Sequence, residues 1–182
     1  MRPTIDSQKL LEALDSELSG KYKVIICGGL VIHTCYSGDA SMDIDSVDRL
    51  QDTLKDLVAK VAASSEVNHE WFNDHASEFF DFDTLLPKGW RKRALKQVPV
   101  FSGKHISLLP LERRDLILTK LFAVFSRGSW EIMKDIKALS THMKASQEEL
   151  LGCTDDLFSM LKGGRWAREK MEIEANIRSY FK

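Results

Sequence analysis

The chain has 182 residues, of which 43% are hydrophobic and 29% are charged, and its formal net charge is −1. This composition is typical of a folded protein with a substantial core and excludes disorder over the whole chain. A near-neutral chain is not built as a general nucleic-acid coat protein, although a local basic patch is compatible with it.

The N-terminal segment and the cysteines bear on the compartment. The first residues are polar and amphipathic, unlike a signal peptide, and no apolar run in the chain reaches transmembrane length. Cys27, Cys35 and Cys153 are an odd, widely spaced set in apolar surroundings, which indicates reduced and mostly buried thiols. The sequence therefore predicts a cytoplasmic protein without a membrane partner.

The first elements in chain order alternate between helices and short strands. Residues 6–20 carry a leucine stripe at helical spacing and predict a helix that ends at Gly20. The β-branched run at 22–27 predicts a strand that stops at Gly28-Gly29. We then expect a short buried helix or turn at 30–38, a second short strand at 41–45 and an amphipathic helix at 46–64.

The second half changes character. Residues 66–96 fit no single period, whereas residues 95–101 and 105–109 are apolar runs around Ser102-Gly103 and predict a hairpin. After Pro110 the spacing predicts four helices, at 111–128, 129–143, 146–161 and 164–182. This order indicates an α+β fold, with a mixed sheet and the N-terminal helix in residues 1–110 and a C-terminal helical bundle in residues 111–182 packed on that core.

Two motifs near the N-terminus suggest chemistry. Asp43 and Asp45 flank Ile44 on the second predicted strand, and residues two apart on a strand project from the same face. Paired carboxylates repel each other unless a cation lies between them, and Mg²⁺ prefers a few carboxylate oxygens together with substrate phosphates. Gly28-Gly29, between a strand and a helix, leaves backbone N–H groups open to a phosphate. Together the motifs favour metal-dependent phosphoryl or nucleotidyl transfer.

The order of these motifs resembles the signature of the nucleotidyltransferase fold. Cys27-Gly28-Gly29 is followed by a short helix and by Asp43-Ile44-Asp45. More narrowly, the chain resembles the small bacterial nucleotidyltransferase-like proteins related to the AbiEii toxin group. That likeness includes Trp71-Phe72-Asn73-Asp74, the following strand pair, and a helix that carries Lys120 and Arg127.

The resemblance implies a nucleotidyltransferase-like core, a function and a set of site residues. The function is Mg²⁺-dependent transfer of a nucleotide from an NTP to an RNA or protein acceptor, as the toxin-type member of a toxin–antitoxin or phage-defence pair with a cognate antitoxin. Asp43 and Asp45 are expected to hold the metal. The nucleotide is expected to be bound by Gly28, Gly29, Ser41, Lys120 and Arg127.

The chain also departs from the pattern of the family. Asp39 stands where the family usually has arginine, and the predicted strand at 105–109 carries no third acid. Asp81 is nominated as the third catalytic acid because Phe80-Asp81-Phe82 alternates as a half-buried strand does, with Asp83 and Asp74 as the next candidates.

Four other interpretations stay open. A catalytically inactive member would serve as a binding or regulatory module, and a purely structural helical adaptor would explain only the C-terminal half. Asp43 and Asp45 alone are also compatible with a strand edge or a helix cap. Lys120 and Arg127 are also compatible with ion pairs to acids such as Asp115 and Glu131.

Overall fold

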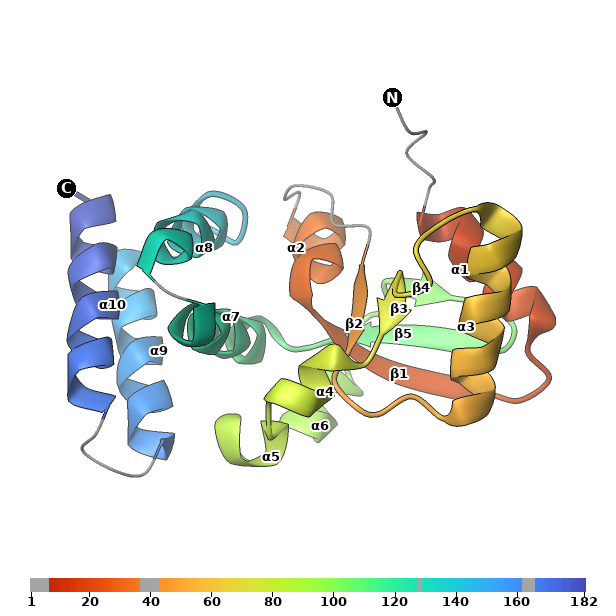
Figure 1. Cartoon of the computed structure of the whole chain (residues 1–182). Helices are drawn as coiled ribbons and strands as arrows, with labels where there is room; N and C mark the ends of the chain where they lie inside the picture. The colour runs from red at the N-terminus through yellow and green to blue at the C-terminus, as the bar shows by residue number, and fades with distance from the viewer. Residues whose placement is uncertain (1–6, 37–42, 128, 162–165) are drawn as a thin grey trace.

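The computed structural model describes residues 7–36, 43–127, 129–161 and 166–182, with side chains described in these ranges except at 33 and 124–132. All of the strands in the described ranges precede residue 111, and the chain after them is helical (Figure 1). This arrangement confirms the predicted α+β fold with a mixed sheet.

Within the described residues the sheet has five strands, in the order β3-β2-β1-β5-β4. Strand β1 is central, and it pairs in parallel with β5 and antiparallel with β2. Strand β3 pairs in parallel with β2, and β4 forms an antiparallel hairpin with β5 around the predicted turn, although β4 begins at Phe101 rather than at residue 95. The strands are β1 (Tyr22–Cys27), β2 (Ile44–Ser46), β3 (Phe72–Asn73), β4 (Phe101–Ser102) and β5 (Ile106–Pro110).

Helices cover the sheet and make up the second half of the chain. In the first half they are α1 (Ser7–Glu17), α2 (Gly28–Tyr36), α3 (Asp52–Ser65), α4 (His75–Phe79), α5 (Phe82–Leu85) and α6 (Trp90–Ala94). Helices α1 and α3 contact each other (Figure 1) and direct buried side chains such as Leu14 and Val58 into the common core. Burial of each aliphatic side chain of this kind stabilises the folded state by roughly 1.5–3 kcal/mol.

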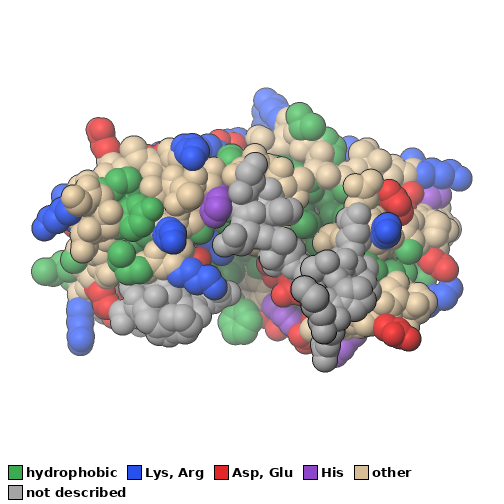
Figure 2. Space-filling view, turned by 90° about the horizontal axis from the view of Figure 1, so that it is seen from above, with side chains coloured by type: hydrophobic (Ala, Val, Ile, Leu, Met, Phe, Trp, Pro, Cys, Tyr) green, Lys and Arg blue, Asp and Glu red, His purple; other side chains and the backbone are tan. Residues whose placement is uncertain are grey.

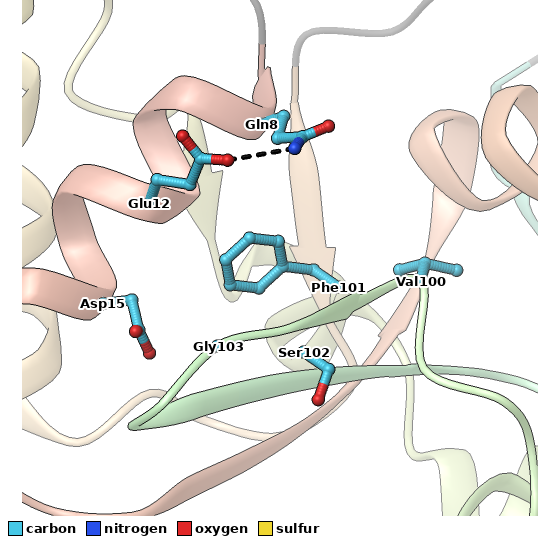
Figure 3. Close-up of a pocket in the computed structure, with 7 residues that line it drawn as sticks. All are labelled: Gln8, Glu12, Asp15, Val100, Phe101, Ser102 and Gly103. Atoms are coloured by element: carbon cyan, nitrogen blue, oxygen red, sulfur yellow. Dashed lines mark hydrogen bonds between the residues drawn. The ribbon is translucent and has the colours of Figure 1, made fainter.

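One carboxylate joins α1 to the hairpin. Asp15 accepts hydrogen bonds from the backbone N–H groups of Lys104, His105 and Ile106, at 2.7–2.8 Å. A side chain at Gly103 would overlap this carboxylate, because a Cβ there would lie 2.3 Å from Asp15 Oδ1. Figure 3 shows Asp15 beside Gly103 at the edge of a polar cavity between α1 and β4. The glycine in the hairpin turn is therefore the contact point for the first helix.

The four C-terminal helices occur as predicted, although their bounds differ slightly. They are α7 (Arg113–Arg127), α8 (Ser129–Thr141), α9 (Gln147–Met160) and α10 (Ala167–Tyr180). Helix α7 contacts α8 and α9, and α10 packs against both α8 and α9. In the described ranges, no helix combines the length and the apolar character that crossing a membrane requires.

A buried ion pair joins the middle of the chain to α7. Asp115 is fully buried and accepts two hydrogen bonds from the Arg93 guanidinium, at 2.7 and 3.0 Å. Burial raises the pKa of the Asp115 carboxyl, although the Arg93 guanidinium opposes this shift. A two-point contact of this kind orients α6 against α7.

Two expectations about the first half need correction. The helix expected from residue 46 begins at Asp52, because Ser46 belongs to β2 and Val47 to Gln51 form the connection. Strand β3 was not predicted, because two residues are too few to show a period. Trp71, just before β3, is 1% exposed and donates from its Nε1 to the carbonyl of Val58, which attaches β3 to α3.

Candidate functional site

The proposed site is built around Gly28, where β1 passes into α2. Gly28 has φ +81°, a conformation that residues with a Cβ rarely adopt. A Cβ at this position would lie 2.1 Å from Asp45 Oδ2, so the carboxylate of Asp45 lies directly over the glycine. Cys27 and Asp45 are register partners between β1 and β2, which explains the close approach.

Asp43 and Asp45 follow the alternation of the strand. Ile44 and Ser46 are buried, whereas Asp45 is half-buried and Asp43 is exposed. Asp43 comes directly before β2, one residue short of the predicted strand position. The predicted placement of Asp45, on a strand beside the glycine pair, is confirmed by the register of β1 and β2.

Lys120 of α7 is near enough to Cys27, the last residue of β1, for its charge to act on the thiol. Burial and then the Asp45 carboxylate raise the pKa of the Cys27 thiol, and the Lys120 ammonium opposes this shift, so both charges act on the same buried sulfur. Lys120 Nζ is also 3.4 Å from Asp135 Oδ1 of α8. Lys120 therefore forms an ion pair, as one interpretation of the sequence expected, and its partner is Asp135.

The remaining predicted nucleotide contacts are less defined. Gly29 is the second residue of α2 and is half-buried, so it lies beside Gly28 at the helix start. Ser41 lies outside the described residues. Arg127 is the last residue of α7, and its side chain is outside the described part of the structure.

The strand predicted around Asp81 is wrong. Asp81 is the N-cap of α5, and its carboxylate accepts hydrogen bonds from Asp83 N–H at 3.2 Å and from Thr84 Oγ1 at 2.6 Å. The bond from Thr84 is the main reason that the pKa of the Asp81 carboxyl lies below its usual value. Asp81 lines a cavity together with Val47 and Asp48. These two residues follow β2, whereas Asp43 precedes it. A catalytic role for Asp81 stays a prediction without the strand that motivated it.

The two reserve candidates for the third acid also have structural partners. Asp83 accepts a hydrogen bond from Trp90 Nε1 at 2.9 Å. Asp74 is 5% exposed, accepts from Leu50 N–H at 2.8 Å and forms a 2.8 Å ion pair with Lys55. Burial raises the pKa of the Asp74 carboxyl, but the Lys55 and Leu50 bonds outweigh burial and hold it below the usual value.

The fit of a metal ion depends on the two acids at β2. Among the described side chains, no group of three or more His, Cys, Asp or Glu residues is arranged to hold a metal ion. Mg²⁺ fits such a sparse site, because it is usually bound by one or two carboxylates, water and substrate phosphates. Asp43 and Asp45 are the residues that would hold it.

One polar residue at the site was not singled out from the sequence as a candidate site residue. Asn73 of β3 is the register partner of Asp45, so the two side chains are neighbours on one face of the sheet. Asn73 was part of the quoted Trp71–Asp74 motif, but only the strand pairing shows that it stands beside Asp45.

One face of the molecule shows how its surface charges are distributed. On the face shown in Figure 2, Lys and Arg side chains are spread among Asp and Glu side chains at both ends of the molecule. This distribution agrees with the near-neutral net charge of −1.

Comparison with known proteins identifies the family. Neither a curated protein nor a solved structure matches the chain. A family model described as "Nucleotidyltransferase of unknown function (DUF6036)" matches residues 6–150, which include every strand, the Gly28-Gly29 turn and both site acids. This match covers well over half of the chain, which therefore belongs to this family of nucleotidyltransferases.

Proposed function

We propose that the protein binds an NTP with Mg²⁺ and transfers the nucleotidyl group to a hydroxyl of an RNA or protein acceptor. The observation that carries this proposal is the contact of the Asp45 carboxylate with Gly28 at the start of α2. It brings an acid of the Asp-x-Asp pair to the glycine turn where phosphate would bind.

In the proposed transfer, some residues would bind the metal and others would bind the phosphates. Asp43 and Asp45 would hold Mg²⁺, which would supply positive charge to the phosphate oxygens. The N–H groups at the start of α2 would bind the phosphates, and Lys120 of α7 would add a positive charge nearby. The acceptor oxygen bonds to the α-phosphorus, pyrophosphate leaves with its bonding electron pair, and the acceptor proton passes to a site carboxylate.

The biological setting that we propose is a toxin–antitoxin or phage-defence pair with a cognate antitoxin. Its support is the resemblance of the Gly-Gly, Asp-x-Asp and Trp-apolar-Asn-Asp motifs to the AbiEii-related proteins. A toxin of this type should arrest growth when it is expressed alone, and Asp45→Asn should relieve the arrest at equal protein level.

Binding and transfer are measured separately. Calorimetry with each of the four NTPs, with and without Mg²⁺, should detect a nucleotide that binds only with the metal. We expect Asp45→Asn to weaken this binding at least tenfold, because it removes a charged metal ligand. The matched control is Asp56→Asn, which removes the same charge from the exposed surface of α3. Failure of every NTP to bind would reject the proposal.

Lys120 provides a second, smaller test of the site. Lys120→Gln should weaken NTP binding several-fold, and the loss should shrink at high salt because it is electrostatic. The same variant also removes the partner of Asp135, so thermal unfolding must be measured in parallel. Unchanged NTP affinity at low salt would restrict Lys120 to its ion pair.

A second candidate function is nucleotide binding without transfer. Its specific support is that the three candidates for a third acid, Asp74, Asp81 and Asp83, all accept hydrogen bonds from structural donors. Label from an α-labelled NTP should reach an acceptor in a cell extract if the protein is an enzyme. Binding without such labelling would favour the inactive module.

A further inference from the structure

The pairing of β2 with β3 places a neutral side chain beside the two acids. The strands run parallel, with Ile44 opposite Phe72 and Asp45 opposite Asn73. Neighbouring strands lie about 4.8 Å apart, and partner residues of a parallel pair project from the same face. Asn73 is therefore the residue of β3 that is closest in register to the proposed metal ligand.

The burial pattern supports this shared face. Ile44 and Phe72 are buried at 0% and 2% exposure, whereas Asp45 and Asn73 are both half-buried. The apolar pair thus packs into the core, and the polar pair lies on the other face of the sheet. Asp74, the acid next to Asn73, is directed to Leu50 and Lys55 instead.

Two backbone hydrogen bonds hold the carboxamide of Asn73. Its Nδ2 donates to the carbonyl of Glu70 at 3.0 Å, and its Oδ1 accepts from His75 N–H at 3.0 Å. These bonds distinguish the oxygen from the nitrogen, because each end meets a backbone group that only it can satisfy. The two bonds fix the orientation of the side chain. Because the side chain is an amide, it adds no negative charge beside Asp45.

We propose that Asn73, the neutral register partner of Asp45, adds no negative charge beside the two acids and thereby limits the metal site to one divalent ion. This inference rests on the proposed function. Two carboxylates balance the charge of one Mg²⁺, and a second ion about 3.5–4 Å from the first needs a further anionic ligand to offset their repulsion. In this proposal the single Mg²⁺ enters the site bound to the phosphates of the nucleotide.

The number of bound ions tests the proposal directly. Mn²⁺ is the probe, counted by electron paramagnetic resonance in the presence of ATP with an α,β-methylene bridge, which cannot transfer its nucleotide. The wild-type protein should hold one Mn²⁺ per chain. Asn73→Asp should hold two, with the second ion bound at least tenfold more tightly than any second ion in the wild type.

A matched variant separates the site from the surrounding turn. Asn68→Asp makes the same chemical change in the exposed turn before β3, where Asn68 Oδ1 accepts from Glu70 N–H. It should leave the ion count at one. Asn73→Asp should also unfold at a lower temperature in EDTA and recover more stability than Asn68→Asp when Mn²⁺ is added, because only its new charge adjoins Asp45.

The outcomes distinguish this inference from the function on which it rests. Two Mn²⁺ ions on the wild-type protein would overturn the one-ion site while leaving Mg²⁺–NTP binding intact, and this measurement needs no variant to fold. A folded Asn73→Asp protein that still binds a single ion would also overturn it. If the analogue and Mn²⁺ do not bind at all, the proposed function fails and the inference fails with it.

Discussion

The acids at β2 and the acids after β3 are close in sequence but differ in what surrounds them. Asp45 lies against a glycine that has no side chain, at the start of a helix. Asp74, Asp81 and Asp83 accept hydrogen bonds from Leu50, Thr84 and Trp90, respectively, and these bonds secure a connection, a helix start and a buried ring. Asp74, Asp81 and Asp83 therefore serve local structure, whereas Asp45 stands at the turn from β1 into α2.

Replacement of the glycine beneath Asp45 should produce the largest effect on the β2 side. Gly28→Ala forces a Cβ into a left-handed conformation, which costs about 1–2 kcal/mol, and the Cβ overlaps the Asp45 carboxylate as well. We expect a lower free energy of unfolding together with loss of Mg²⁺–NTP binding, measured by denaturant titration and calorimetry.

A second glycine provides the matched control. Gly152 lies within α9, and a Cβ there would meet no atom within 4 Å. Gly152→Ala should leave nucleotide binding unchanged and raise the free energy of unfolding by roughly 0.5–1 kcal/mol, because alanine is the better helix former. Normal nucleotide affinity in Gly28→Ala would show that the phosphate site lies elsewhere.

On the β3 side, Asp74→Asn should act on stability rather than on the metal. Loss of the charged acceptor for Leu50 N–H and Lys55 should cost about 1.5–3 kcal/mol. The pKa of Asp74 is lower in the folded protein than its usual value, so its contribution is complete above about pH 4 and is lost as the pH falls below that. Unfolding measured between pH 3 and pH 7 should therefore show a shallower acid dependence in the variant.

Nucleotide binding should respond differently to the loss of Asp74 and of Asp45. Asp74→Asn should bind Mg²⁺–NTP as tightly as the wild type, whereas Asp45→Asn should lose affinity for Mg²⁺–NTP. Weakened nucleotide binding in a stable Asp74→Asn protein would place Asp74 in the site.

The smallest effect is expected for Asp81→Ala. Loss of the cap should slightly lower the unfolding temperature, because α5 has only four residues and the Asp81 side chain is exposed. Transfer of label from an α-labelled NTP should be unchanged. If transfer disappears while the unfolding temperature is kept, Asp81 is the third acid despite its position at a helix start.

The long elements were predictable from the sequence because their periods are long enough to see. The leucine stripe of α1, the apolar run of β1 and the four C-terminal helices each extend over several turns or a full strand. Strand β3 and helices α4 to α6 are too short to show a period, and they depend on tertiary contacts such as Trp71 with Val58. Phe80-Asp81-Phe82 shows how three residues that alternate can belong to a helix cap.

The site was predictable only in its local part. Asp43, Asp45 and the glycine pair could be related because one short strand and one turn connect them in sequence. The neighbour of Asp45 on the other side, Asn73, lies 28 positions away and is brought there by the register of β2 and β3. No local pattern specifies that register, so the sequence alone did not relate Asn73 to Asp45.

The contact of Asp15 with the hairpin has a consequence for the order of folding. Its three hydrogen bonds join residues 89, 90 and 91 positions apart in the chain. The central strand β1 likewise has β5 as its parallel neighbour, with Tyr22 opposite Ile106. Contacts of such high sequence separation slow folding, because a large loop must close before they form. During synthesis, α1 and β1 can meet α3 and β2 early, but their contacts with the β4–β5 hairpin must wait until residue 110 has left the ribosome.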